Sequence, residues 1–285
     1  MLGVIRLTFR ELTAKKITIC LFIVCTLIWS MLAFALNLDI VDGALVGMKI
    51  FGNEATPNES TVDDQTGEVI SDLVSLESLV LGIEMVVAGI CYWGSILLAL
   101  FATAPLINAL MEKGRVDLLL SKPISRLQIL SSQVLGVVLV MTLLTTYLMG
   151  AIWLVMSTKS GIWNFQFLVA IAIVIVMFAV MYGVVLLISV NFNSTALALI
   201  TTYGLIIASI VLGFHDELAP QINLPWRHVY VTLYHILPNF SEMTMIVAQL
   251  TRGDAVESWY PLVSSVSFGA VMYALAGWRF ARRDF

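Results

Sequence analysis

Residues 160–215 read SGIWNFQFLVAIAIVIVMFAVMYGVVLLISVNFNSTALALITTYGLIIASIVLGFH, with no Lys, Arg, Asp or Glu. One helix crosses a hydrocarbon core of ~30 Å with ~20 residues, so this stretch is long enough for two crossings. The whole chain shares its character, with 60% hydrophobic and 12% charged residues and a mean hydropathy of +0.96. Soluble domains carry about 25% charged residues. The sequence therefore predicts a polytopic membrane protein.

We expect an all-α fold with six transmembrane helices. Inside residues 160–215 the only plausible break is Asn191–Thr195, so we interpret this stretch as a hairpin of two spans. A membrane β-barrel would show short alternating segments, whereas these apolar runs are continuous. The predicted spans cover residues 17–36, 85–111, 130–157, 160–190, 196–214 and 261–278.

The basic residues indicate the orientation, because Lys and Arg resist translocation. With the N-terminus inside, eleven of the fifteen basic residues fall on the cytoplasmic side. We therefore expect both termini in the cytoplasm of a multi-pass protein of the cell (inner) membrane. The four left outside are Lys49, Lys159, Arg227 and Arg252.

The segments outside the spans complete a single transmembrane domain, residues 1–285. Residues 1–16 have apolar side chains at helical spacing and predict an amphipathic interfacial helix. Residues 37–78 are rich in Asp, Glu, Gly, Ser and Thr and predict a solvated extracytoplasmic loop. Residues 215–260 form a second extracytoplasmic segment with an apolar run at Met243–Leu250. This run is either a helix on the membrane surface or a re-entrant outer gate helix packed on protein.

A basic island, EKGRVDLLLSKPISRLQIL at residues 112–130, separates the second span from the third. Pro123 lacks a backbone donor and prevents a helix that ends near Ser121 from continuing. Ser125 and Gln128 match a capping box, so we expect the third span to begin there. The island therefore predicts a short surface helix in a cytoplasmic segment, residues 112–129. Its apolar ridge, Val116 and Leu118–Leu120, could dock on a soluble partner, or the island could simply anchor the topology.

The island resembles the intracellular loop of type-2 (exporter) ABC transporter permeases, a family that includes copper-processing permeases. The resemblance rests on Glu112–Gly114, Leu118–Ser121 and Pro123–Arg126. The basic terminus Arg279–Phe285 and the segment Leu237–Phe240 are similar in a weaker way. The long acidic segment at residues 37–77 departs from many members, so no cargo follows from the resemblance.

The resemblance implies a permease subunit that pairs with another copy or a relative and forms an export path for separate ATP-binding subunits. No Gly-x-x-x-x-Gly-Lys-Ser/Thr stretch follows a predicted strand, so we expect ATP and magnesium on the partner ATPase. We expect no catalytic, cofactor or metal residue in this chain, and no nucleic-acid partner. The residues expected to couple to the ATPase are Glu112, Gly114, Arg115, Val116, Leu118, Leu119, Leu120, Pro123, Ile124 and Arg126. Those expected at the outer gate are Pro238, Asn239, Phe240, Met243, Val247 and Leu250.

Two other function classes stay open. An ion-coupled secondary transporter would need an ionisable group near the bilayer centre, and the only candidate, Glu84, is expected at the outer interface. A copper-handling component would use His and Met ligands, although their spacing matches no ligand motif. The cysteines lack histidine neighbours and are interpreted as packing residues without a disulfide framework. The possible metal ligands are His215, His228, His235, Met243 and Met245; the cysteines are Cys20, Cys25 and Cys91.

Overall fold

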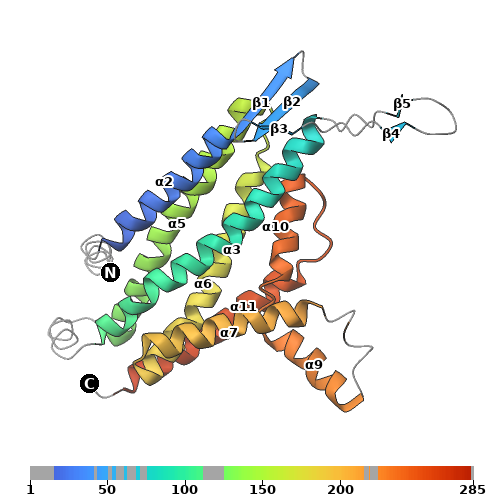
Figure 1. Cartoon of the computed structure of the whole chain (residues 1–285). Coiled ribbons are helices and arrows are strands. Elements are labelled where there is room, and N and C mark those ends of the chain that lie inside the picture. Colours follow the sequence, from blue (N-terminus) through green and yellow to red (C-terminus); the bar gives the residue numbers. More distant parts are fainter. Residues whose placement is uncertain are drawn as a thin grey trace.

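The structure is a computed structural model, and its elements are drawn in Figure 1. It describes residues 16–41, 44–50, 53–55, 61–62, 69–70, 76–111, 125–214, 218 and 224–283. The predicted interfacial helix at residues 1–16 lies outside this part except for Lys16.

Eight helices dominate the described chain. Their bounds are α2 (Ile17–Ala35), α3 (Leu76–Leu110), α5 (Arg126–Ser160), α6 (Gln166–Phe192), α7 (Thr195–Gly213), α9 (Leu224–Ile236), α10 (Glu242–Arg252) and α11 (Tyr260–Ala281). Five of them, α3, α5, α6, α7 and α11, are long and apolar enough to cross a membrane. Helix α2 is apolar but shorter, with Thr18–Phe34 as its apolar part. The chain is therefore a multi-pass membrane protein.

Local sequence sets two of the helix boundaries as expected. The Ser125 side chain accepts a hydrogen bond from the Gln128 backbone N–H, and the Gln128 side chain accepts one from the Ser125 N–H, both at 3.2 Å. This capping box starts α5 and confirms the predicted start of that span. Helix α6 ends before Asn193, which is left-handed with φ 51°, and Ser194 caps α7. The predicted break at Asn191–Thr195 is also confirmed.

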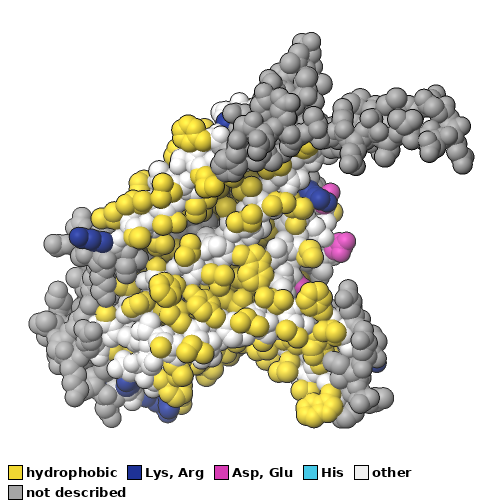
Figure 2. Space-filling model, in the orientation of Figure 1, with side chains coloured by type: hydrophobic (Ala, Val, Ile, Leu, Met, Phe, Trp, Pro, Cys, Tyr) yellow, Lys and Arg dark blue, Asp and Glu magenta, His cyan; other side chains and the backbone are white. Residues whose placement is uncertain are grey.

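The helix ends gather at two opposite ends of the molecule (Figure 1). The end of α3 and the beginning of α5 lie at the same end of the molecule as the α6–α7 break and the end of α11. At the opposite end, which we call the sheet end, α2 passes into β1, α3 begins, and α10 ends. In Figure 2 hydrophobic side chains cover most of the described surface between these two ends.

Helix α6 forms the centre of the bundle and contacts α3, α5, α7, α10 and α11. Its contact with α11 is close because Gly269 faces α6 without a side chain. A methyl group on Gly269 would lie 3.0 Å from Val180 Cγ2 and 3.2 Å from its Cα. Small residues permit this approach of two helix backbones, which is a main source of helix association in lipid.

Strands occupy part of the segment that the sequence predicts as a solvated loop. β1 (Leu36–Val41), β2 (Ala44–Ile50) and β3 (Asn53–Ala55) form an antiparallel sheet in that order. β4 (Thr61–Val62) pairs antiparallel with β5 (Val69–Ile70). The expectation of an all-α fold therefore holds for the long apolar elements, and residues 36–70 add β structure to it. In β1 the apolar Leu36, Leu38 and Ile40 alternate with Asn37 and Asp39, which is the period of two typical of a strand.

Candidate functional site: a turn inside the bundle and helix α10

The candidate site begins at a non-helical turn, residues 237–241, between α9 and α10. Helix α10 continues from this turn along α3 and α6 towards the sheet end, and an extended segment then returns to α11 (Figure 1). The side chain that reaches the turn from α3 is Tyr92, near the middle of that 35-residue helix. At 1.5 Å per residue, Tyr92 lies about 24 Å from the first residue of α3. The turn is therefore deep in the bundle.

Three long helices satisfy the backbone of this turn. From α3, the Tyr92 hydroxyl donates to the Phe240 carbonyl at 2.8 Å. From α11, the Ser265 hydroxyl accepts from the Asn239 backbone N–H at 3.1 Å. Non-helical backbone at membrane depth needs such partners, because lipid offers none.

A second serine, on α7, completes the support from the third helix. The Ser209 hydroxyl accepts from the Ser241 N–H at 3.3 Å, and the Ser241 hydroxyl donates to the Ser209 carbonyl at 3.0 Å. Trp93 of α3 adds a side-chain bond, its Nε1–H donating to Thr244 Oγ1 at 3.0 Å. The turn and the first turn of α10 are thus bonded to α3, α7 and α11.

The residues expected at the outer gate come together at this turn and along one face of α10. Pro238, Asn239 and Phe240 are buried in the turn. Met243 and Val247 of α10 are fully buried, and Leu250 is half-buried. The Phe240 ring packs edge-on against Trp93 with centroids 4.8 Å apart and lies 5.0 Å from the Tyr92 ring. One face of the run Met243–Leu250 is therefore packed on protein, while Met245 is exposed.

The far end of α10 meets a buried carboxyl group. Glu84 of α3 is 0% exposed and accepts a hydrogen bond from Asn164, which lies between α5 and α6. The same Asn164 side chain donates to the Thr251 carbonyl in the last turn of α10. The sequence predicts Glu84 at the outer interface; the residue lies in the first third of α3, near the sheet end, and is enclosed by protein.

The side chains that support the turn were missed because apolar periodicity does not single them out. Tyr92, Ser209 and Ser265 each stand inside a long apolar run, where a polar group needs a partner. That requirement is the one signal that could have identified them from sequence. It would not have shown which backbone groups they bind.

Two apolar grooves border this site on the surface of the bundle. One lies between α3 and α7 and is lined by Trp93, Leu97 and Phe101 together with Ile207 and Ile210. The other lies between α3 and α10, where Gly89 and Gly94 have no side chain to fill the space. Both grooves share one face of α3.

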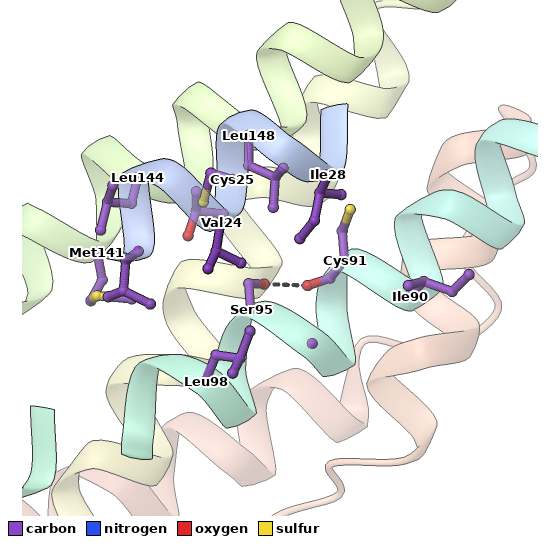
Figure 3. Close-up of a pocket in the computed structure, with 13 residues that line it drawn as sticks. Val24, Cys25, Ile28, Ile90, Cys91, Ser95, Leu98, Met141, Leu144 and Leu148 are labelled. Carbon is purple, nitrogen blue, oxygen red and sulfur yellow. Dashed lines mark hydrogen bonds between the residues drawn. The ribbon is translucent and has the colours of Figure 1, made fainter. Parts of the chain in front are cut away.

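A separate apolar pocket lies between α2, α3 and α5 (Figure 3). Cys25 and Cys91 line it, and both are free thiols, as is Cys20. The Ser95 hydroxyl in its wall donates to the Cys91 carbonyl of its own helix. Its lining is otherwise almost entirely hydrocarbon, so the pocket provides no set of groups for a reaction.

Of the residues expected to couple to an ATPase, the structure describes Arg126; the others lie outside the described residues. Arg126 is the first residue of α5, and its guanidinium donates to the Arg283 carbonyl at 2.5 Å and to the Ala281 carbonyl at 3.4 Å. Arg283 in turn donates to the Val190 carbonyl at the end of α6. The C-terminal segment is thereby hydrogen-bonded to the start of α5 and to the end of α6.

The possible copper ligands are scattered. His228 and His235 are exposed on α9, whereas His215 lies outside the described residues. Met243 is buried and Met245 is 68% exposed, so they face different surroundings on α10. Over the described residues, no group of three or more His, Cys, Asp or Glu is placed to hold a metal ion.

Comparison with known proteins identifies the family. The family described as "ABC-2 family transporter protein" matches residues 3–285, almost the full length. No curated protein and no solved structure matches the chain. A match over this length, together with the five long apolar helices, leads to one conclusion: the chain belongs to the ABC-2 family of transporter membrane proteins, whose permease subunits work with ATPase partner subunits.

Proposed function

We propose that this chain is the permease subunit of an ATP-driven exporter. It forms the translocation path as a dimer with a second permease, identical or related. Two separate ATP-binding cassette subunits bind ATP with magnesium and hydrolyse it, and the chain itself is not an enzyme. The observation that carries the proposal is the turn at residues 237–241, which three helices hold inside the bundle while α10 packs on α3 towards the sheet end. A re-entrant element of this kind suits an outer gate on a transport path.

The proposed topology has six spans, with α2 as the first, and places the sheet end outside. Both termini and residues 112–129 then face the cytoplasm of an inner membrane. The ends of α3, α5, α6 and α11 that lie together opposite the sheet end support this arrangement (Figure 1). The arginines at that end, among them Arg126, Arg279 and Arg283, agree with the positive-inside rule.

A second permease would pack against the face of α3 that carries the two apolar grooves. Symmetric pairing places the same surface of both copies in contact. Gly89 and Gly94 on this face would allow close approach, as small residues do at helix interfaces in lipid. The gate turn borders this face, so the path between two copies would pass α10.

The ATPase would dock on the island between α3 and α5. Arg126, which belongs to the island, begins α5 and is hydrogen-bonded to the segment that ends α11. A displacement of the docked island would therefore act on two spans together. Leucine side chains on its ridge would each contribute about 1.5–3 kcal/mol if fully buried on the partner.

The test is the double variant Leu118→Ser with Leu119→Ser. The tagged chain is purified with its ATPase from the native membrane, and co-purification and ATP hydrolysis are measured. We expect the double variant to insert normally but to lose the ATPase or the stimulation of hydrolysis. The same changes at Leu135 and Leu139, exposed on α5, are the control for added polarity. Full co-purification and full stimulation in the Leu118 and Leu119 double variant would reject the coupling role.

A further inference from the structure

The side chain of Asn164 joins three segments that are distant in sequence. Its Nδ2 group donates to Glu84 Oε2 of α3 at 2.7 Å and to the Thr251 carbonyl of α10 at 2.7 Å. Its Oδ1 accepts from the Gln166 backbone N–H at 3.1 Å, where α6 begins. An amide has two donor hydrogens and one carbonyl oxygen, so this orientation uses both donors and an acceptor site. The reversed orientation would place oxygen against two acceptors.

The Asn164 backbone is fixed as well, because the Trp153 indole N–H donates to the Asn164 carbonyl at 2.7 Å. Trp153 belongs to α5 and packs edge-on against Trp163. The amide is therefore held in place by α5 and by the start of α6. It acts as a fixed donor to which α3 and α10 attach.

Helix α10 depends on Asn164 for the end of its hydrogen-bond pattern. The last carbonyls of a helix have no partner within it. In α10 the N–H groups of Gly253 and Asp254 bond to the carbonyls of Gln249 and Leu250, so the Thr251 carbonyl receives the Asn164 amide instead. Both Glu84 and Thr251 are fully buried, so water does not replace these bonds while α10 is seated.

The end of α10 lies beside the start of α6. Gly253 follows α10 with φ +82°, and a methyl group on it would lie 2.4 Å from Oε1 at the end of the Gln166 side chain. The Asn164 bond to the Thr251 carbonyl is made in this region.

One atom beside Asn164 opposes the seated arrangement of α10. Glu84 Oε1 is buried and has no hydrogen-bond partner among the described residues. A buried acceptor without a donor lowers the stability of the state that contains it, and access to water removes this effect. The Asn164 bond to the Thr251 carbonyl thus favours a seated α10, and the unpaired oxygen favours its release. An element with two opposed terms can occupy either state.

We propose that Asn164 is a latch that holds the sheet end of α10 against α3 and releases when the gate opens. The latch deepens the proposed function, on which its role in transport rests. Asn164 is a positioning residue, since it acts through α10 and need not touch the cargo.

The test measures access to the buried face of α10. Val247, fully buried, is replaced by Cys in a chain whose three native cysteines are changed to Ala, and the protein is placed in lipid nanodiscs. The rate of maleimide labelling reports release of the helix. Asn164→Leu removes the bond to the Thr251 carbonyl, and we expect labelling to rise about tenfold or more. Glu84→Leu removes the Asn164–Glu84 bond together with the unpaired oxygen and keeps the bond to the Thr251 carbonyl, so we expect a smaller change than in Asn164→Leu.

Two controls separate release from general loosening. Glu84→Gln keeps an oxygen for the Asn164 donor, and Thr158→Val removes only local bonds on the exposed side of α5, so neither should raise labelling. Met245→Cys, at the exposed face of α10, should label at one rate in every variant. Unchanged labelling of the Val247→Cys thiol in both Asn164→Leu and Glu84→Leu would overturn the latch.

A second measurement separates the latch from the proposed function. In the complex with the ATPase, ATP should raise labelling of the Val247→Cys thiol in the parent, and Asn164→Leu should be labelled rapidly with or without ATP. If ATP leaves the labelling rate of the parent unchanged while Asn164→Leu is still labelled faster, Asn164 does hold α10 in place but the gate function is wrong. If ATP acts equally on both, Asn164 is not the latch.

Discussion

Replacing Tyr92 with Phe removes one hydroxyl from the centre of the bundle and keeps the ring. That hydroxyl donates to the Phe240 carbonyl at 2.8 Å. The carbonyl has no helical donor, because the Thr244 N–H that could reach it in a regular helix bonds to Ser241 instead. Tyr92→Phe therefore leaves a buried carbonyl without its donor.

The expected effect follows from the burial of this group. A buried acceptor deprived of its donor costs about 1–3 kcal/mol, which is a factor of about 5–150 in an equilibrium constant. The loss falls on the turn and on α10, which starts from it. The opening equilibrium of α10 should shift towards the open state by that factor.

Hydrogen exchange of the α10 backbone amides measures this equilibrium directly, because exchange occurs from the open state. We expect residues 246–250 to exchange about 5–150 times faster in Tyr92→Phe than in the parent. The matched control is Tyr203→Phe, which removes the hydroxyl bond to the Leu97 carbonyl, 2.9 Å long, in the middle of α3. That carbonyl lies inside a continuous helix and keeps its helical donor.

Both variants lose a tyrosine hydroxyl, so the difference between their α10 exchange rates reports the bond to the turn. Equal exchange of α10 in both variants would show that the Phe240 carbonyl finds another donor. The account of a turn that depends on α3 for its backbone bonds would then fail.

Three further predictions follow from the packing and the topology. Val247→Asp places a charge against the apolar surfaces of α3 and α6 at a cost of several kcal/mol and should abolish export or assembly. The control Gln249→Asp, on the same helix, should retain both. Equal export by the two variants would exclude a packed gate. Gly269→Ala forces α11 away from Val180 and should lower the free energy of unfolding by about 1–3 kcal/mol. The control is Gly82→Ala, because a methyl group on Gly82 meets nothing within 4 Å. Single cysteines at Ser60 and Ser258 should react with an impermeant thiol reagent on intact cells and one at Ser125 should not; labelling at 125 would reverse the proposed orientation.

The helices themselves could be predicted because their boundaries depend on local chemistry. Ser125 with Gln128, and Asn193 with Ser194, mark helix ends through their own backbone and side-chain bonds. Apolar run length located the other long helices to within a few residues, apart from two starts. Helix α6 begins at Gln166, six residues after the predicted start at 160, and helix α3 begins at Leu76, nine residues before the predicted start at 85. Glu77 and Glu84 interrupt the apolar run there, and only the contact of Glu84 with Asn164 shows why the helix retains that carboxyl group.

The site could be predicted only in part, because its partners are distant in sequence. The gate residues were chosen from a resemblance at Leu237–Phe240 and an apolar run, and they do lie together. Their support comes from Tyr92, Ser209 and Ser265 on three helices, and no local pattern relates these positions. The strands at residues 36–70 were missed for another reason: the polar composition of the segment predicts a loop, although Leu36, Leu38 and Ile40 alternate with Asn37 and Asp39 as in a strand.

The two ends of α10 are held with unequal strength, and this difference indicates how the helix would move. At the deep end, α3, α7 and α11 supply bonds to residues 239–241, and Phe240 packs among aromatic rings. At the sheet end, the Asn164 amide donates one hydrogen bond to α10, and a buried carboxyl oxygen beside it is without a partner. When a packed element has one strongly and one weakly held end, local opening starts at the weak end, because fewer interactions are lost there. Helix α10 should therefore swing about residues 239–241 and open at the end nearest Glu84.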